Sequence, residues 1–295
     1  MLHRNPRQPT GTARTRNPGT PAVQVIAVTG GKGGVGKSTV SVNLATAFAQ
    51  LGRRTLLFDG DMGLANADVL LGITPRYTLA QFIRGERSLD EILVDAPQGF
   101  QVLPGASGVG QLAALSAMEH VGLIRELGTV CADLETLIVD TSAGIAPGVL
   151  QLAQAAQHVL VVVCDEPASI TDAYGLIKVL SRDHGVERFQ ILANMTRERG
   201  QGRRLFETLS RVTARFLDVT LDYAGDVPED PWLRRSIRDQ RPVLEAYPGS
   251  PSAKALKLLA DGADTWPVPA GMRGHIEFFA DRLVRRGPPA LEVVR

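Results

Sequence analysis

The sequence has few of the features that mark secreted, metal-binding or membrane-spanning proteins. Its only two cysteines, Cys131 and Cys164, lie far apart and form neither a C-x-x-C pair nor a disulfide framework, which suits a reducing cytoplasm. The five histidines are scattered without the spacing of a metal site. The longest strongly apolar run, residues 159–164, is far too short to cross a bilayer. We therefore expect a cytoplasmic protein.

An excess of charge is also missing. The chain has 32 basic and 31 acidic side chains among 295 residues, so it is not built mainly to coat nucleic acid, and direct nucleic-acid binding is not expected. Residues 1–21 differ from the rest, because they contain four arginines, four prolines and no acid, and no apolar stretch follows that could serve as a signal peptide. We interpret this segment as a disordered basic arm, with a weak interaction tail as the alternative.

One decapeptide carries most of the functional information. Residues 30–39 read Gly-Gly-Lys-Gly-Gly-Val-Gly-Lys-Ser-Thr, which from Gly31 fits the phosphate-binding P-loop G-x-x-x-x-G-K-[ST]. The glycines let successive backbone N–H groups point at phosphate oxygens, while Lys37 supplies a positive charge and Ser38 a hydroxyl for Mg²⁺. ATP and Mg²⁺ are therefore the predicted cofactors. The predicted phosphate-binding residues are Gly31, Lys32, Gly33, Gly34, Val35, Gly36, Lys37, Ser38 and Thr39.

Two further apolar runs end in carboxylates. Residues 54–58 lead into Asp59-Gly-Asp61, and residues 136–139 lead into Asp140, followed by Thr-Ser-Ala-Gly. An apolar strand that ends in Asp beside a P-loop is the Walker B arrangement, so we predict that Asp140 holds Mg²⁺ together with Ser38. We predict that Asp61 orients the attacking water and that Asp59 supports Asp61 without contacting the reacting groups itself. Lys37 and Asp61 are thus predicted catalytic residues.

The order of the elements predicts an α/β fold. Helical stretches separate strand-like runs at 24–29, 54–58, 100–103, 136–140, 159–164, 189–194 and 220–226. Such alternation predicts a mostly parallel, doubly wound sheet that binds ligands beyond the C-terminal strand ends. We assign residues 22–265 to one P-loop ATPase domain and residues 266–295 to a linker and a C-terminal amphipathic helix, expected over residues 274–286. Its apolar face, which begins at Ile276, is flanked by arginines, and either it contacts a membrane or it docks on the protein.

These motifs resemble the deviant Walker A ATPases of the MinD/ParA class, which are P-loop NTPases of the SIMIBI group. The P-loop of residues 32–39 and the acidic strand ends at 59–61 and 140–144 carry this resemblance. Longer strings at 61–72, 164–174, 192–195 and 264–267 are similar to the FleN/FlhG family of flagellar-number regulators, over roughly residues 22–285.

The resemblance implies a role for the second lysine of the loop. In relatives the lysine at the position of Lys32 reaches across a face-to-face dimer to phosphates bound by the partner, so that Lys32 joins the catalytic residues. ATP then holds two monomers together, and hydrolysis releases them. The resemblance also places Asn194, Pro228, Glu229 and Asp230 at the adenine.

The same resemblance implies partners. The ATP dimer is expected to bind and restrain a FleQ-type σ54-dependent flagellar activator. Stimulation of the GTPase FlhF is less well supported, since residues 1–21 lack the Asp-Gln-Ala motif of many relatives. The C-terminal helix of MinD relatives contacts the membrane reversibly, which implies a location at the cytoplasmic face of the inner membrane or at the cell pole.

Other classes fit less well. Iron–sulfur carriers and arsenite-pump ATPases need clustered thiol ligands, which two distant cysteines do not supply. A DNA-segregating ParA needs basic surface patches, and within the fold only the cluster of Arg197, Arg199, Arg203 and Arg204 offers one. A ligase or synthetase would need a second substrate motif. The alternative that stays open is a MinD-like ATPase that positions the division machinery or another polar machine.

Overall fold

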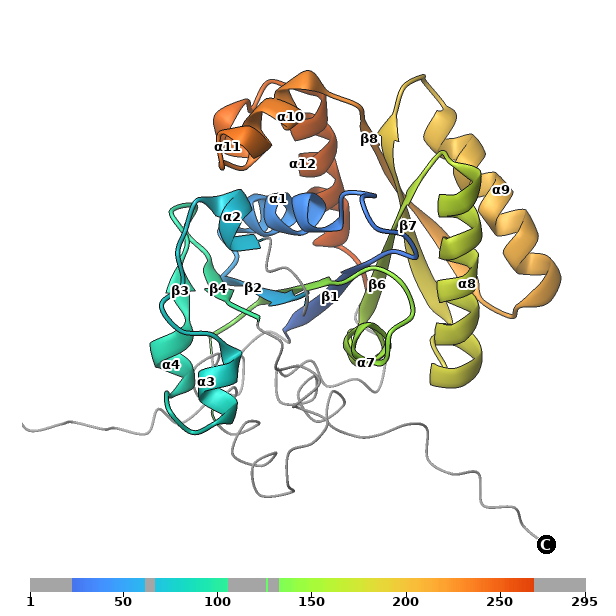
Figure 1. Ribbon diagram of the computed structural model, residues 1–295. Coiled ribbons are helices and arrows are strands. Elements are labelled where there is room, and N and C mark those ends of the chain that lie inside the picture. Colours follow the sequence, from blue (N-terminus) through green and yellow to red (C-terminus); the bar gives the residue numbers. More distant parts are fainter. Residues whose placement is uncertain (1–22, 62–66, 106–125, 127–132, 268–295) are drawn as a thin grey trace, which may run out of the picture.

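The structure of the protein is a computed structural model, which describes residues 23–61, 67–105, 126 and 133–267 (Figure 1). The expected basic arm at 1–21 and the expected amphipathic helix at 274–286 lie outside the described residues. In the part of the chain that is described, no helix combines the length and the apolar composition needed to span a bilayer.

A single sheet forms the centre of the described chain, with its strands in the order β3-β4-β2-β5-β1-β6-β7-β8. All neighbouring strands are parallel except β3 and β4, which confirms the predicted mostly parallel sheet. The sequence pattern did not predict β3, because a strand of two residues has no periodicity to detect. The strands are β1 (Gln24–Thr29), β2 (Thr55–Gly60), β3 (Val94–Asp95), β4 (Gln101–Leu103), β5 (Thr136–Thr141), β6 (His158–Cys164), β7 (Arg188–Thr196) and β8 (Thr220–Pro228).

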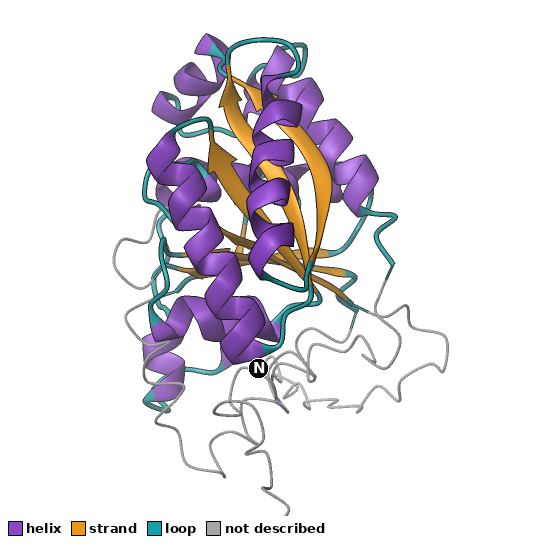
Figure 2. Cartoon of the chain, turned by 90° about the vertical axis from the view of Figure 1, so that its right-hand side faces the viewer, coloured by secondary structure: helices purple, strands orange, loops and turns teal. Residues whose placement is uncertain are grey.

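Helices cover both faces of this sheet, as Figures 1 and 2 show. The helices are α1 (Lys37–Gln50), α2 (Ala67–Leu71), α3 (Leu79–Ile83), α4 (Leu89–Ile92), α7 (Pro147–Ala155), α8 (Pro167–His184), α9 (Gln201–Phe216), α10 (Pro231–Arg238), α11 (Val243–Ala246) and α12 (Pro251–Ala263). Side chains of α1 and α12 pack together in one core, whereas those of α7, α8 and α9 contribute to the cores on the other face.

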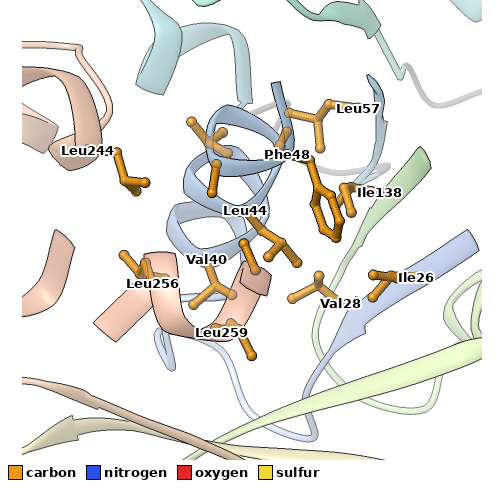
Figure 3. Close-up of a cluster of buried hydrophobic side chains, with 14 of the residues drawn as sticks. Ile26, Val28, Val40, Leu44, Phe48, Leu57, Ile138, Leu244, Leu256 and Leu259 are labelled. Carbon is orange, nitrogen blue, oxygen red and sulfur yellow. The ribbon is translucent and has the colours of Figure 1, made fainter. Parts of the chain in front are cut away.

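Strand β1 shows why both faces must be covered. Ile26 and Val28 point into the core beneath α1 and α12, while Val25 and Ala27 point to the opposite core, and none of the four is more than 2% exposed. Burying a side chain of this kind stabilises the fold by about 1.5–3 kcal/mol. In Figure 3 the side chains of α1 lie directly against those of β1. This packing sets the position of α1, whose first two residues are the last two of the P-loop motif.

The packed body of the protein extends to Trp266, where the sequence analysis places the start of a linker. The Trp266 indole packs against the core, and its centroid lies 5.3 Å from that of the His158 ring. Burial lowers the pKa of His158 to about 4, so this ring is neutral near pH 7. Nearby, the Gln24 side-chain amide donates a hydrogen bond of 2.7 Å to the carbonyl of Ala263 and so ties the end of α12 to β1.

We therefore expect Trp266→Ala to destabilise the fold. Loss of the aromatic contact and of buried apolar area should lower the free energy of unfolding by about 1–3 kcal/mol, measured by urea denaturation. Leu258→Ala is the control, because Leu258 lies on α12 with 71% of its surface exposed and its truncation should change stability little. An effect of Trp266→Ala no larger than that of Leu258→Ala would place the end of the fold before residue 266.

Candidate functional site

The P-loop follows β1 and is held between two neighbouring elements. A side chain at Gly31 would overlap the backbone carbonyl of Asp172 on α8, since its Cβ would lie 2.2 Å from that oxygen. Gly36, the N-cap of α1, has φ of 91°, and a Cβ there would lie 2.4 Å from Nδ2 of Asn194. Both positions therefore require glycine. The loop delivers the N-terminus of α1 and its free N–H groups to the place where phosphate is predicted to bind.

Asn194 reinforces this loop. It is buried at the end of β7, and its Nδ2 donates a hydrogen bond of 2.7 Å to the carbonyl of Val35. The next residue, Met195, has φ of 59° and lies where the register between β7 and β8 is irregular. The structure thus gives the Asn194 amide a contact with the P-loop backbone, while its predicted contact with adenine stays a prediction.

Asp140 has the chemistry expected of a residue on the Mg²⁺ side of the site. Its carboxylate is fully buried near the end of β5, where Oδ1 accepts a hydrogen bond of 2.9 Å from the Ser41 hydroxyl and Oδ2 has no hydrogen-bond partner among the described residues. Burial raises its pKa to about 7, although the nearby Ser38 hydroxyl favours the ionised form. A buried carboxylate oxygen without a partner fits a hard cation or its bound water. Ser38 and Asp140 would hold Mg²⁺, which when bound neutralises phosphate charge.

Ser41 is a site residue that the sequence analysis missed. It lies one turn after the Ser and Thr of the P-loop motif, so helical periodicity alone does not distinguish it from other polar residues of α1. Only the packing of α1 against β5 brings its hydroxyl to Asp140. Its hydrogen bond engages Oδ1 of the carboxylate and so leaves the other oxygen for the predicted cation.

Lys37 lies at the centre of the charged groups. Its side chain is buried, and desolvation lowers its pKa, whereas the carboxylates of Asp140 and Asp61 oppose this shift. Burial strengthens the interaction of the ammonium group with any anion in the site, because little water screens it. This placement suits the predicted role of Lys37 in binding phosphate.

Asp59 and Asp61 leave β2 in different environments. Asp59 is buried and accepts hydrogen bonds from the backbone N–H groups of Asp61, at 3.1 Å, and Ala67, at 3.2 Å. Burial raises the pKa of Asp59 to about 6. Asp61 is half-buried, and its Oδ1 accepts a hydrogen bond of 2.8 Å from the Ser142 hydroxyl. The Asp59 carboxylate therefore fixes the backbone N–H groups of Asp61 and Ala67. The Asp61 carboxylate lies close enough to the P-loop to interact with the Lys37 ammonium group.

Lys32 lies on the exposed side of the P-loop. Its Nζ is 2.7 Å from Oε2 of Glu166, the N-cap residue of α8, and this contact raises the pKa of Lys32. Both side chains are well exposed, so water screens the ion pair and it is easily broken. Glu166 is a second residue that the sequence analysis missed, because no local motif signals an ion pair between positions 134 residues apart.

The other three residues predicted to surround adenine lie at the end of β8 or directly after it. Glu229 forms ion pairs with Arg197, at 2.8 Å, and with Arg234. The Asp230 carboxylate is buried, caps α10 through the Trp232 N–H at 2.9 Å, and accepts a hydrogen bond of 2.6 Å from the Ser252 hydroxyl. The Asp230 side chain therefore joins α10 to α12. Contacts of Pro228, Glu229 and Asp230 with adenine stay predictions.

The buried charge of Asp140 predicts a pH-dependent stability. Its native pKa of about 7 exceeds the ordinary value of 3.8, so the native state binds more protons than the unfolded state between roughly pH 4 and 7. The contribution of this group to the free energy of unfolding therefore falls as pH rises through that window. Asp140→Asn should raise the stability of the nucleotide-free protein by roughly 2–4 kcal/mol above about pH 7, and by less near pH 5.

The same substitution should abolish the stabilisation by Mg²⁺ and ADP, because an amide is a poor ligand for Mg²⁺. Urea unfolding across this pH range, with and without Mg²⁺ and ADP, measures both effects. Asp222→Asn is the matched control, since Asp222 forms an exposed ion pair with Arg188. Equal effects of the two substitutions would contradict the buried charge at Asp140.

Comparisons with known proteins agree with this geometry. Residues 26–243 match the family described as "CobQ/CobB/MinD/ParA nucleotide binding domain". The chain is 54% identical to "Antiactivator FleN" of Pseudomonas aeruginosa, over 89% of this chain and 94% of that protein. It is 32% identical to "Flagellum site-determining protein YlxH" of Helicobacter pylori, over 80% of each.

Solved structures share the fold. The "MinC:MinD cell division protein complex" of Aquifex aeolicus contains a chain that superposes with a TM-score of 0.66 at 25% identity, over 86% of this chain and all of that one. The septum site-determining protein MinD of Pyrococcus horikoshii, solved with Mg-ADP, superposes with a TM-score of 0.64 at 24% identity, over 82% and 96% of the two chains.

Proposed function

Since the chain belongs to the CobQ/CobB/MinD/ParA nucleotide-binding family, we propose that it is an ATP-dependent dimerising switch that controls flagellar number and placement. It is an ATPase of the MinD/ParA class and uses ATP and Mg²⁺. In the proposed cycle two monomers associate face to face with ATP between them, and hydrolysis separates them. Lys37, Ser38 and Asp140 bind the nucleotide and its metal, and Asp61 orients the attacking water.

The contrast between the two lysines of the P-loop carries this proposal. Lys37 is buried among carboxylates, whereas Lys32 lies at the exposed face of the same loop, where it forms an exposed ion pair with Glu166. One lysine therefore serves the phosphates of its own chain. The other is available to a phosphate that approaches from outside, as in a second subunit. In such a dimer the charge of each γ-phosphate is fully neutralised only when both chains are present.

This arrangement predicts opposite effects for the two partners of the exposed ion pair. Lys32→Ala should still bind ATP but should not dimerise or hydrolyse it. Glu166→Gln should favour the ATP dimer. Lys32 must break its contact with residue 166 to reach the phosphates of the other subunit, and a neutral glutamine binds it less strongly than glutamate does. The dissociation constant of the dimer should therefore fall about two- to tenfold. Light scattering with a non-hydrolysable ATP analogue and with ADP measures both. Exposed Asp222→Asn is again the charge-matched control. A dimer that forms with ADP, or that tolerates Lys32→Ala, would contradict the proposal.

The flagellar assignment rests on the relatives. Two of them carry names that describe an antiactivator and a flagellum site-determining protein, and each aligns with four fifths or more of this chain. We propose that the ATP dimer binds and restrains a FleQ-type σ54-dependent flagellar activator, with FlhF as a further partner. The second candidate is a MinD-like ATPase that positions the division machinery or another polar machine, which septum site-determining relatives favour. Reversible membrane contact through residues 274–286 stays a prediction.

A deletion strain distinguishes the two candidates. Loss of the gene should increase the number of flagella per cell, because the activator is no longer restrained. A Lys32→Ala allele should reproduce this phenotype, since it produces no ATP dimer. Electron microscopy of single cells counts the flagella, and the position of the division septum is recorded in the same cells. Normal flagellar counts with misplaced septa would favour the positioning alternative.

A further inference from the structure

The register of two strands brings Ser142 to Asp61. Strands β2 and β5 are parallel neighbours, and their last two register pairs are Asp59 with Asp140 and Gly60 with Thr141. Asp61 and Ser142 are the next residues along each strand, so the sheet places them side by side. The Ser142 hydroxyl donates a hydrogen bond of 2.8 Å to Oδ1 of Asp61. This contact therefore follows from backbone geometry as well as from the orientation of the side chains.

The loop that carries Ser142 is attached on both sides. Before it, the Thr141 hydroxyl donates a hydrogen bond of 3.1 Å to the carbonyl of Val28 in β1. After it, the N–H of Gly144, whose φ is 92°, donates a hydrogen bond of 3.0 Å to the carbonyl of Gly30 at the start of the P-loop. Ser142 is thus fixed relative to the loop that binds phosphate, and its hydroxyl is a well-positioned donor for a neighbouring carboxylate.

Asp61 needs such a restraint because an attractive charge lies close by. Burial lowers the pKa of Lys37, and the carboxylates of Asp140 and Asp61 oppose this shift, so the Lys37 ammonium attracts the Asp61 carboxylate. An aspartate that turned fully toward this lysine would be misplaced for water, and it would compete with phosphate for Lys37. A hydrogen bond from Ser142 to one carboxylate oxygen opposes that rotation and defines where the other oxygen points.

We infer that Ser142 is a positioning residue, whose hydroxyl holds the Asp61 carboxylate in the orientation that aligns the attacking water. This inference rests on the proposed function, in which Asp61 orients that water. Ser142 itself takes no proton and touches no reacting atom. Its contribution is to the geometry of hydrolysis and not to the binding of nucleotide, because binding uses Lys37, Ser38 and Asp140.

A double-mutant cycle on the full chain tests the inference. Phosphate release with Mg²⁺ and ATP gives kcat and KM for the wild type, Ser142→Ala, Ser142→Thr, Asp61→Ala and the double variant, and single-turnover measurements extend the range to slow variants. Ser142→Ala should lower kcat about tenfold, the order expected for loss of one hydrogen bond to a charged group. Its KM for ATP and its affinity for ADP should stay within about twofold of the wild type, because only an interaction of the hydrolysis step is lost.

Two further comparisons separate positioning from a general structural effect. Ser142→Thr keeps the hydroxyl and should restore kcat to within about threefold of the wild type. In the Asp61→Ala background, Ser142→Ala should cause no additional loss, since the residue it acts through is gone. Thr141→Val is the matched control, because it removes a neighbouring hydroxyl that bonds to backbone. The fold-change in kcat caused by Thr141→Val should be the same with and without Asp61→Ala, because the two residues act independently. Thermal unfolding measures how much Thr141→Val lowers the stability of the fold.

The outcomes separate this inference from the proposed function. If Asp61→Ala hydrolyses ATP at the wild-type rate, the role of Asp61 in the proposed function is wrong. If Asp61→Ala is slow but Ser142→Ala is not, only the inference about Ser142 is overturned. An equal loss from Ser142→Ala with and without Asp61, or no recovery in Ser142→Thr, would also overturn it.

Discussion

The parallel register of β2, β5 and β1 is the constraint on which the site depends. Asp59, Asp140 and Val28 are register partners across these three neighbouring strands, so the segments that follow them leave the sheet at one edge. Those segments carry the candidate site residues: they are the acidic end of β2, the acidic end of β5 and the P-loop. A shift by one residue would turn every side chain of a strand to the opposite face. The buried alternation of β1 between two cores makes such a shift costly.

The same packing buries charged groups, which costs free energy because these groups lose contact with water. Asp140 and Asp59 are carboxylates with raised pKa values, and Lys37 is a buried ammonium group with a lowered one, because each has lost water. Without a ligand these charges only partly compensate one another. In the proposed function, phosphate and Mg²⁺ bring charges opposite to those of the buried groups, so their binding offsets part of the free-energy cost of burying these groups. Oδ2 of Asp140, which has no hydrogen-bond partner in the part of the chain that is described, shows this most clearly.

Around this buried centre lie exposed or half-buried contacts that can change during the proposed cycle. The ion pair of Lys32 with Glu166 is screened by water, and the hydrogen bond between Ser142 and Asp61 links two loops and not two packed cores. Both involve residues to which we assign roles in dimer formation or hydrolysis. The glycines at 31 and 36, in contrast, are confined by direct contact with α8 and with Asn194. The site therefore combines a rigid phosphate cradle with weaker contacts at its rim.

The amino-acid sequence by itself determined the class of fold and the candidate residues of the P-loop, because these depend on local signals. Apolar runs revealed the long strands, and the spacing of Gly31, Gly36, Lys37 and Ser38 is a continuous motif. Tertiary structure decided the antiparallel β3, the packing of Trp266, and the contacts of Ser41, Glu166 and Ser142 with residues 81–134 positions away. It also gave Asp230 a structural task between α10 and α12. Such contacts have no local period or motif, since they arise only when the sheet register and helix packing bring distant segments together.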